Sequence, residues 1–138
     1  MCEADPIHQT SNKTETDSSI SGQVCVFEAN ALTKLPIANI NVLYDKDAFG
    51  AILVEQRAPY VERMSSYLAD DCLVLLAGAS RYTDVDGGPP FNLSEELVKE
   101  FWSDFEIVDK QTEQYNPKAN ERGFCDVTYI LKRRKANK

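Results

Sequence analysis

Short runs of β-branched and aromatic residues recur along this 138-residue chain, separated by segments with a helical pattern. Such runs are typical of strands, whereas apolar residues three and four positions apart indicate the buried face of a helix. Strands that alternate with helices favour an α/β domain built with crossover connections. The pattern predicts strands over residues 23–27, 40–44, 72–77, 105–109 and 126–132, and helices over residues 58–69 and 94–103.

One of these runs, Cys72 to Ala77, is apolar at every position. A strand buried on both faces of a parallel sheet needs such a run, so we expect this strand to be central and covered on both sides. Pro59 is expected to open the first helix in its first turn, where a missing N–H costs nothing. Ser94 is expected to cap the second helix. The last two strands are expected to pair as an antiparallel hairpin.

The two ends of the chain differ from the middle in composition. Residues 1–21 are almost entirely polar. Such a stretch cannot bury enough apolar surface to offset its ordering entropy, so we expect a disordered tail. Residues 135–138 are expected to form a short basic tail. The folded domain is therefore predicted to span residues 22–134.

Composition also excludes several classes of function. A formal net charge of -7 disfavours binding to nucleic-acid phosphates, and no apolar run is long enough to predict a membrane helix. The only histidine, His8, lies in the expected tail, which argues against His-based acid–base catalysis and a His-ligated metal. Neither a P-loop nor a G-x-G turn occurs. The four cysteines form no C-x-x-C pair and are typical of free thiols in a reducing compartment, so a cytoplasmic location is expected.

Three motifs carry a resemblance to a known family. Residues 44–57 read YDKDAFGAILVEQR and continue into the helical segment PYVERMSSYLA, residues 88–94 read GPPFNLS, and residues 116–123 contain Asn-Pro-Lys and Arg-Gly before the last strand. In this combination and spacing, the chain from about residue 22 to residue 134 resembles the C-terminal portion of the thiopurine S-methyltransferase family.

The resemblance implies a particular fold. It is a partial Rossmann-like sheet of the S-adenosylmethionine-dependent methyltransferases that lacks the first two strands and ends in an antiparallel hairpin. The usual strand order of that class is 3-2-1-4-5-7-6, and residues 23–27 and 40–44 correspond to strands 3 and 4. The two absent strands carry the glycine-rich turn and the acidic residue that hold the cofactor in this class.

The resemblance also implies site residues. Glu28 and Ala29 would lie beside the adenine of S-adenosylmethionine, and Lys46 stands where the family has a cofactor-contacting arginine. Lysine keeps the charge but loses the planar fork of arginine. Pro90 and Phe91 resemble a loop that borders the pocket for the small-molecule thiol substrate. The alternative is that this segment only leads into the following helix and that Phe91 lies in the core.

Asp45 has two interpretations at this point. Its carboxylate either caps the turn after the strand, which is common for Asp, or helps to set the cofactor pocket.

The implied activity is transfer of a methyl group from S-adenosylmethionine to a thiol sulfur of a small molecule. An acidic aromatic thiol is already partly thiolate at neutral pH, so proximity, alignment and exclusion of water are the main requirements. We therefore assign no catalytic residue and no metal. Because the cofactor-binding first half is missing, we expect this isolated fragment to be inactive. The alternatives are a halide or thiol methyltransferase relative, which shares a G-G-P-P-[FY] loop, and a non-catalytic truncated product.

Overall fold

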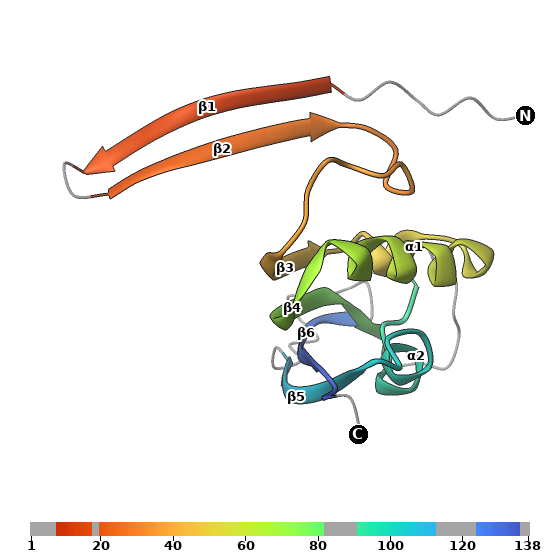
Figure 1. The fold of residues 1–138 in the computed structure, drawn as a ribbon. Helices are drawn as coiled ribbons and strands as arrows, with labels where there is room; N and C mark the ends of the chain where they lie inside the picture. The colour runs from red at the N-terminus through yellow and green to blue at the C-terminus, as the bar shows by residue number, and fades with distance from the viewer. Residues whose placement is uncertain (1–7, 18–19, 82–90, 113–123, 136–138) are drawn as a thin grey trace, which may run out of the picture. The chain divides into compact units, whose positions relative to one another are not determined.

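A computed structural model describes residues 8–17, 20–81, 91–112 and 124–135. The chain divides into two compact units, Met1–Pro36 and Ile37–Lys138. Each is described by itself, with the element labels of Figure 1. The predicted boundary at residue 22 therefore lies inside the first unit. The ends at residues 1–7 and 136–138 are outside the described residues, as are Pro90 and the segment 113–123.

The first unit contains an antiparallel hairpin of β1 (His8–Asp17) and β2 (Ile20–Glu28) (Figure 1). The predicted strand at residues 23–27 is confirmed and is longer than expected. The expectation of a tail without regular structure was wrong for residues 8–17. Threonine favours strands, and antiparallel pairing satisfies the backbone groups of a polar segment without a large apolar face.

The second unit contains a four-stranded sheet in the order β3-β4-β6-β5. Its members are β3 (Ile40–Lys46), β4 (Leu68–Arg81), β5 (Phe105–Thr112) and β6 (Phe124–Arg133). β3 runs parallel to β4, whereas β6 is antiparallel to both β4 and β5. The predicted α/β class and the C-terminal antiparallel hairpin are confirmed, and the order matches strands 4-5-7-6 of the methyltransferase sheet.

Two α-helices and one short 3-10 helix connect the strands. They are η1 (Phe49–Ala51), α1 (Val54–Tyr67) and α2 (Glu95–Phe101). The expectation that Pro59 opens α1 was wrong, because the helix begins at Val54 and contains Pro59 in its interior. Pro59 and Glu55, whose carbonyl would accept the missing bond, are both exposed, so water can satisfy that carbonyl.

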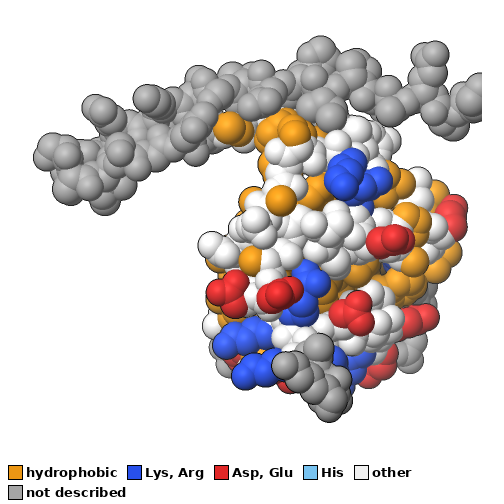
Figure 2. All heavy atoms as spheres, viewed as in Figure 1, with side chains coloured by type: hydrophobic (Ala, Val, Ile, Leu, Met, Phe, Trp, Pro, Cys, Tyr) orange, Lys and Arg blue, Asp and Glu red, His pale blue; other side chains and the backbone are white. Residues whose placement is uncertain are grey.

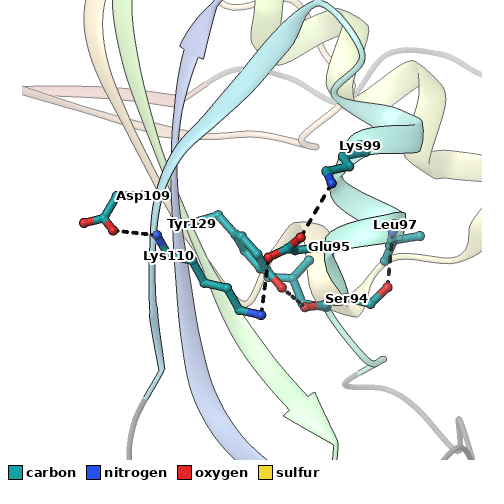
Figure 3. Close-up of polar contacts among 8 residues, drawn as sticks. Ser94, Glu95, Leu97, Lys99, Asp109, Lys110 and Tyr129 are labelled. Atoms are coloured by element: carbon teal, nitrogen blue, oxygen red, sulfur yellow. Dashed lines mark hydrogen bonds and ion pairs between the residues drawn. The ribbon is translucent and has the colours of Figure 1, made fainter.

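The core lies on one face of the sheet. Along β4, Cys72, Val74 and Leu76 are buried, while Leu73 and Leu75 between them are only half-buried. Both helices lie on the same side of the sheet (Figures 1 and 3). β4 is therefore central, as predicted, but the expectation of cover on both faces was wrong for the described part of this unit. Other members of the core are Phe49, Tyr60, Val61, Leu93, Val98, Trp102, Phe105, Val127, Tyr129 and Leu131.

No described helix of this unit covers the opposite face of the sheet, which is called the open face below. Val42 and Tyr44 of β3 are 54% and 63% exposed. They pair in register with Leu73 and Leu75 of β4, and paired residues of neighbouring strands point to the same side. These four side chains therefore form an apolar strip, with the hydroxyl of Tyr44 as its polar group, on the face that points away from the helices.

Gly78 gives a stability test of the contact between β4 and the segment before α2. A Cβ added at Gly78 would lie 2.8 Å from Leu93 Cδ2, and Leu93 is fully buried. We expect Gly78→Ala to lower the free energy of unfolding by about 1–3 kcal/mol, measured by urea denaturation. Gly50→Ala is the matched control, because no neighbouring atom lies within 4 Å of the position that a Cβ would take there. Equal effects of the two substitutions would contradict the packing argument.

Candidate functional site

A hollow of about 310 Å³ lies on the open face of the sheet, at the carboxyl ends of β3 and β4. In α/β folds, ligands bind outside the carboxyl ends of the strands. Its size is at the lower end of the range for small-molecule sites. The residues that line it are Tyr44, Lys46, Asp47, Ala77, Gly78, Gln111, Thr112, Asp126 and Thr128.

Strand register explains why residues distant in the sequence line the same hollow. Lys46 pairs with Ala77, Ala77 with Thr128, and Thr128 with Gln111. These four residues form one row across all four strands of the sheet. Because paired residues point to the same side, the row presents one ammonium, one hydroxyl and one amide to the open face.

Asp45 fixes the turn that follows β3. Its side chain is buried, and its Oδ1 accepts hydrogen bonds from the backbone N–H groups of Ala48 (3.1 Å) and Phe49 (3.3 Å). Its Oδ2 accepts a hydrogen bond from the hydroxyl of Tyr60 at 2.5 Å. Burial raises the pKa of Tyr60 far above its ordinary value, and the hydrogen bond and charge of Asp45 raise it further. Asp45 is thus a turn cap, and its side chain points away from the hollow.

Lys46 and Asp47 leave the strand on the side of the hollow. Strand alternation directs the exposed Lys46 to the face opposite Asp45. Asp47 has a φ of 65°, in the left-handed region, and its N–H donates to the carbonyl of Ala77 at 2.9 Å. This bond ties the turn to β4 beside the hollow. Asp is among the residues that tolerate the left-handed conformation, but with strain.

The segment from Phe91 to Ser94 is held at several points. The N–H of Phe91 donates to Gly50 O and that of Leu93 to Ala79 O, both at 2.8 Å. The hydroxyl of Tyr129 donates to Leu93 O at 2.9 Å (Figure 3). Ser94 Oγ accepts from Leu97 N, which confirms the predicted cap of α2.

Figure 3 also shows charged side chains at the start of α2. Glu95 forms ion pairs at 3.6 Å with Lys99 on the same helix and with Lys110 on β5. Lys110 Nζ lies 5.6 Å from the centre of the Tyr129 ring. Burial, together with the charges of Glu95 and Glu96, raises the pKa of Tyr129 to about 12. These contacts fasten the segment before α2 to the sheet.

The structure places the sequence-predicted site residues in different surroundings. Lys46 lines the hollow, whereas the half-buried Phe91 does not. Glu28 and Ala29 are exposed at the end of β2, in the other unit. Pro90 lies outside the described residues.

Sequence reasoning missed several lining residues. Gln111, Thr112, Asp126 and Thr128 come from β5 and β6, after the motifs that carried the resemblance. Only the register of the last hairpin brings them to the ends of β3 and β4, and no local sequence signal specifies that register. Asp47 could have been predicted as a lining residue, because it directly follows Lys46 in the sequence.

The described residues contain neither a group of three or more His, Cys, Asp or Glu side chains arranged to hold a metal ion nor a helix long and apolar enough to cross a membrane. In the view of Figure 2, Lys and Arg side chains are interspersed with Asp and Glu. That face therefore presents no continuous basic surface of the kind that binds nucleic acid.

Comparisons with known proteins agree on one family. The family model described as thiopurine S-methyltransferase (TPMT) matches residues 3–133. The match begins earlier than the expected start of the resemblance at about residue 22, so the β1–β2 hairpin belongs to the matched region. Proteins named thiopurine S-methyltransferase are similar to this chain: that of Vibrio vulnificus is 23% identical over 86% of the chain and 60% of its own length. That of Pseudomonas putida is 31% identical over 70% of the chain and 48% of its own length. The chain thus spans about 60% or less of these relatives.

Solved structures show the same fold. A putative type 11 methyltransferase from Sulfolobus solfataricus superposes with a TM-score of 0.53 at 17% identity, covering 75% of this chain and 56% of that chain. A SAM-dependent methyltransferase from Anabaena variabilis gives 0.55 at 17% identity, covering 76% and 56%. LepI in complex with SAM gives 0.58 at 5% identity, covering 76% and 29%.

The strain at Asp47 leads to a stability prediction. Glycine adopts a positive φ without steric cost, whereas alanine does not. We expect Asp47→Gly to match or exceed the wild-type melting temperature and Asp47→Ala to fall below that of Asp47→Gly, by about 1 kcal/mol in free energy of unfolding. Thermal unfolding at neutral pH measures both. An alanine variant as stable as the glycine variant would show that this turn does not depend on a left-handed residue.

Tyr129 leads to a pH prediction. In the unfolded chain its pKa is about 10, and in the folded protein it is about 12. Its stabilising contribution is therefore complete below pH 10 and is lost as the pH rises from 10 to 12, because only the unfolded chain releases the proton in that range. Tyr129→Phe should lower stability at pH 7 by about 0.5–1.5 kcal/mol through the lost hydrogen bond to Leu93 O. It should also make the decline between pH 10 and 12 shallower in urea denaturation. An unchanged slope would contradict the assignment.

Proposed function

The chain belongs to the thiopurine S-methyltransferase family, and we propose that it carries the acceptor-binding side of an S-adenosylmethionine-dependent S-methyltransferase. The observation that supports this most directly is the row from Lys46 to Gln111, which lies at the carboxyl ends of β3 and β4 on the open face. The proposed acceptor is a small aromatic thiol. The proposed reaction yields the methyl thioether and S-adenosylhomocysteine.

The described residues fit the acceptor better than the whole cofactor. The hollow of about 310 Å³ suits a small flat molecule. For the cofactor, the chain offers the carboxylate of Glu28, the backbone of Ala29 and the ammonium of Lys46, and its sequence contains no G-x-G turn. When bound, S-adenosylmethionine supplies a methyl group activated on a sulfonium sulfur.

The residues of the hollow act on the acceptor by position and charge. The Lys46 ammonium favours the thiolate over the thiol, because an opposite charge nearby stabilises the ionised form. The thiol proton leaves to water before transfer, so no general base is needed. Tyr44 and Ala77 provide apolar surface against which a ring can lie. Asp47 and Asp126 give the lining a net formal charge of -1 when combined with Lys46, which disfavours acceptors that carry additional negative groups.

We propose that this chain acts in the cytoplasm. Cys72 and Cys125 are buried free thiols. Free thiols persist in reducing compartments, which supports the cytoplasm as the place where this chain acts.

The acceptor site is tested by titrating the isotope-labelled chain with a thiopurine and following backbone amide shifts. We expect shifts at Ala77, Gln111 and Thr128, which form the row with Lys46. Lys46→Met should weaken binding of the thiolate about two- to fivefold, because an exposed charge pair is worth little more. Lys99→Met on α2 is the matched control and should leave binding unchanged. Shifts confined to other parts of the chain would refute the assignment of the hollow.

Cofactor affinity is a separate prediction. We expect the isolated 138-residue chain to bind S-adenosylhomocysteine weakly and to be inactive alone. Losing about four hydrogen bonds to the cofactor costs on the order of 4–6 kcal/mol, which is about a thousandfold or more in affinity. Calorimetric titration of the folded chain measures this, with the longer Pseudomonas putida relative as the positive control. Micromolar binding would show that the cofactor is held by residues other than those expected.

A further inference from the structure

A buried arginine contacts two aromatic rings on the helical side of the sheet. Arg57 of α1 is only 8% exposed. The carbon at the centre of its guanidinium lies 5.2 Å from the centre of the Phe91 ring and 5.8 Å from that of Phe101. A cation at this distance is attracted by the negative face of each ring.

Apart from these two rings, few described groups stabilise the charge of Arg57. Its Nε is buried without a hydrogen-bond partner, and no ion pair to a described carboxylate involves it. Removing a cation from water is costly, and an apolar side chain of similar volume is often equally stabilising or better. Core filling alone would therefore not require an arginine. What the guanidinium adds is a preferred orientation of the rings that it contacts.

Phe91 is the aromatic residue whose backbone is anchored next to the Asp45 turn. Its N–H donates to Gly50 O at 2.8 Å, in the short helix that follows the Asp45 turn. Two residues later, the N–H of Leu93 donates to Ala79 O of β4, also at 2.8 Å. The segment that leads to α2 thus has one anchor on η1 beside Arg57 and another on the sheet.

We propose that Arg57 is a positioning residue that holds Phe91 against η1 through the cation–ring contact. It thereby fixes the start of the segment that leads to α2. The relevance of this contact to an acceptor rests on the proposed function. The contact itself does not, so it can be tested without cofactor or acceptor.

The test compares hydrogen exchange of two backbone amides. In Arg57→Met, which keeps length and loses charge, we expect the Phe91 amide to exchange about five- to thirtyfold faster, the loss expected for a buried cation–ring contact. The Leu93 amide serves as an internal control and should exchange at its wild-type rate. Arg57→Lys keeps the charge but loses the planar stacking, so it should give an intermediate increase.

Each result decides the question. If both amides accelerate together in Arg57→Met, the arginine serves general stability and the proposal is wrong. If the Phe91 amide is unchanged, the contact does not hold the segment and the proposal is also wrong. Should Arg57→Met fail to fold, Arg57→Lys allows the same comparison. A faster exchange at the Phe91 amide alone would support the proposal. Equally faster exchange at the Phe91 and Leu93 amides, or no change, would contradict it. A wild-type protein that does not bind a thiopurine would overturn the proposed function and leave this exchange result unaffected.

Discussion

The buried carboxylate of Asp45 organises the part of the molecule in which the site lies. By accepting bonds from two backbone amides and from Tyr60, it folds the chain into η1 directly after β3. That turn sends Phe49 into the core, where its ring lies 5.9 Å from that of Trp102 and 6.3 Å from that of Tyr60. It also presents the Gly50 carbonyl that Phe91 binds. A buried acceptor with three donors is stable, whereas the same carboxylate without them would carry a large desolvation cost.

The alternation of side chains along β3 then directs Asp45 and Lys46 to opposite faces of the sheet. Asp45 points into the core, so Lys46 must point to the open face. The same alternation along β4 buries Val74 and Leu76 under the helices and leaves Leu75 half-buried on the other side. Structural residues and candidate site residues are therefore neighbours in sequence but lie on opposite faces of one sheet. This arrangement lets the turn be rigid while the hollow stays accessible.

Most elements of the second unit could be predicted from the sequence, because each strand and each helix has a clear local pattern. Ser94 had the composition of a helix cap and is one. The predictions failed where the outcome depends on pairing rather than on local pattern. The strand at residues 8–17 has no apolar periodicity, and only its register with β2 defines it. The continuous apolar run in β4 suggested cover on both faces, yet periodicity cannot reveal whether a covering layer lies within the same unit.

In the candidate site, too, some residues could be predicted from a local motif and others depend on strand pairing. Lys46 could be placed by its motif, but its companions Thr128 and Gln111 depend on two antiparallel registers, and a one-residue slip would turn them to the other face. The charge of the hollow follows from these registers as well, since Asp126 comes with Thr128 on alternate positions of β6. With two carboxylates beside one ammonium, and a chain of net charge -7, long-range attraction does not favour an anionic acceptor. Under the proposed function, recognition of a thiolate would therefore depend on direct contact with Lys46 and on the fit of a flat ring against the sheet, both of which are short-range effects.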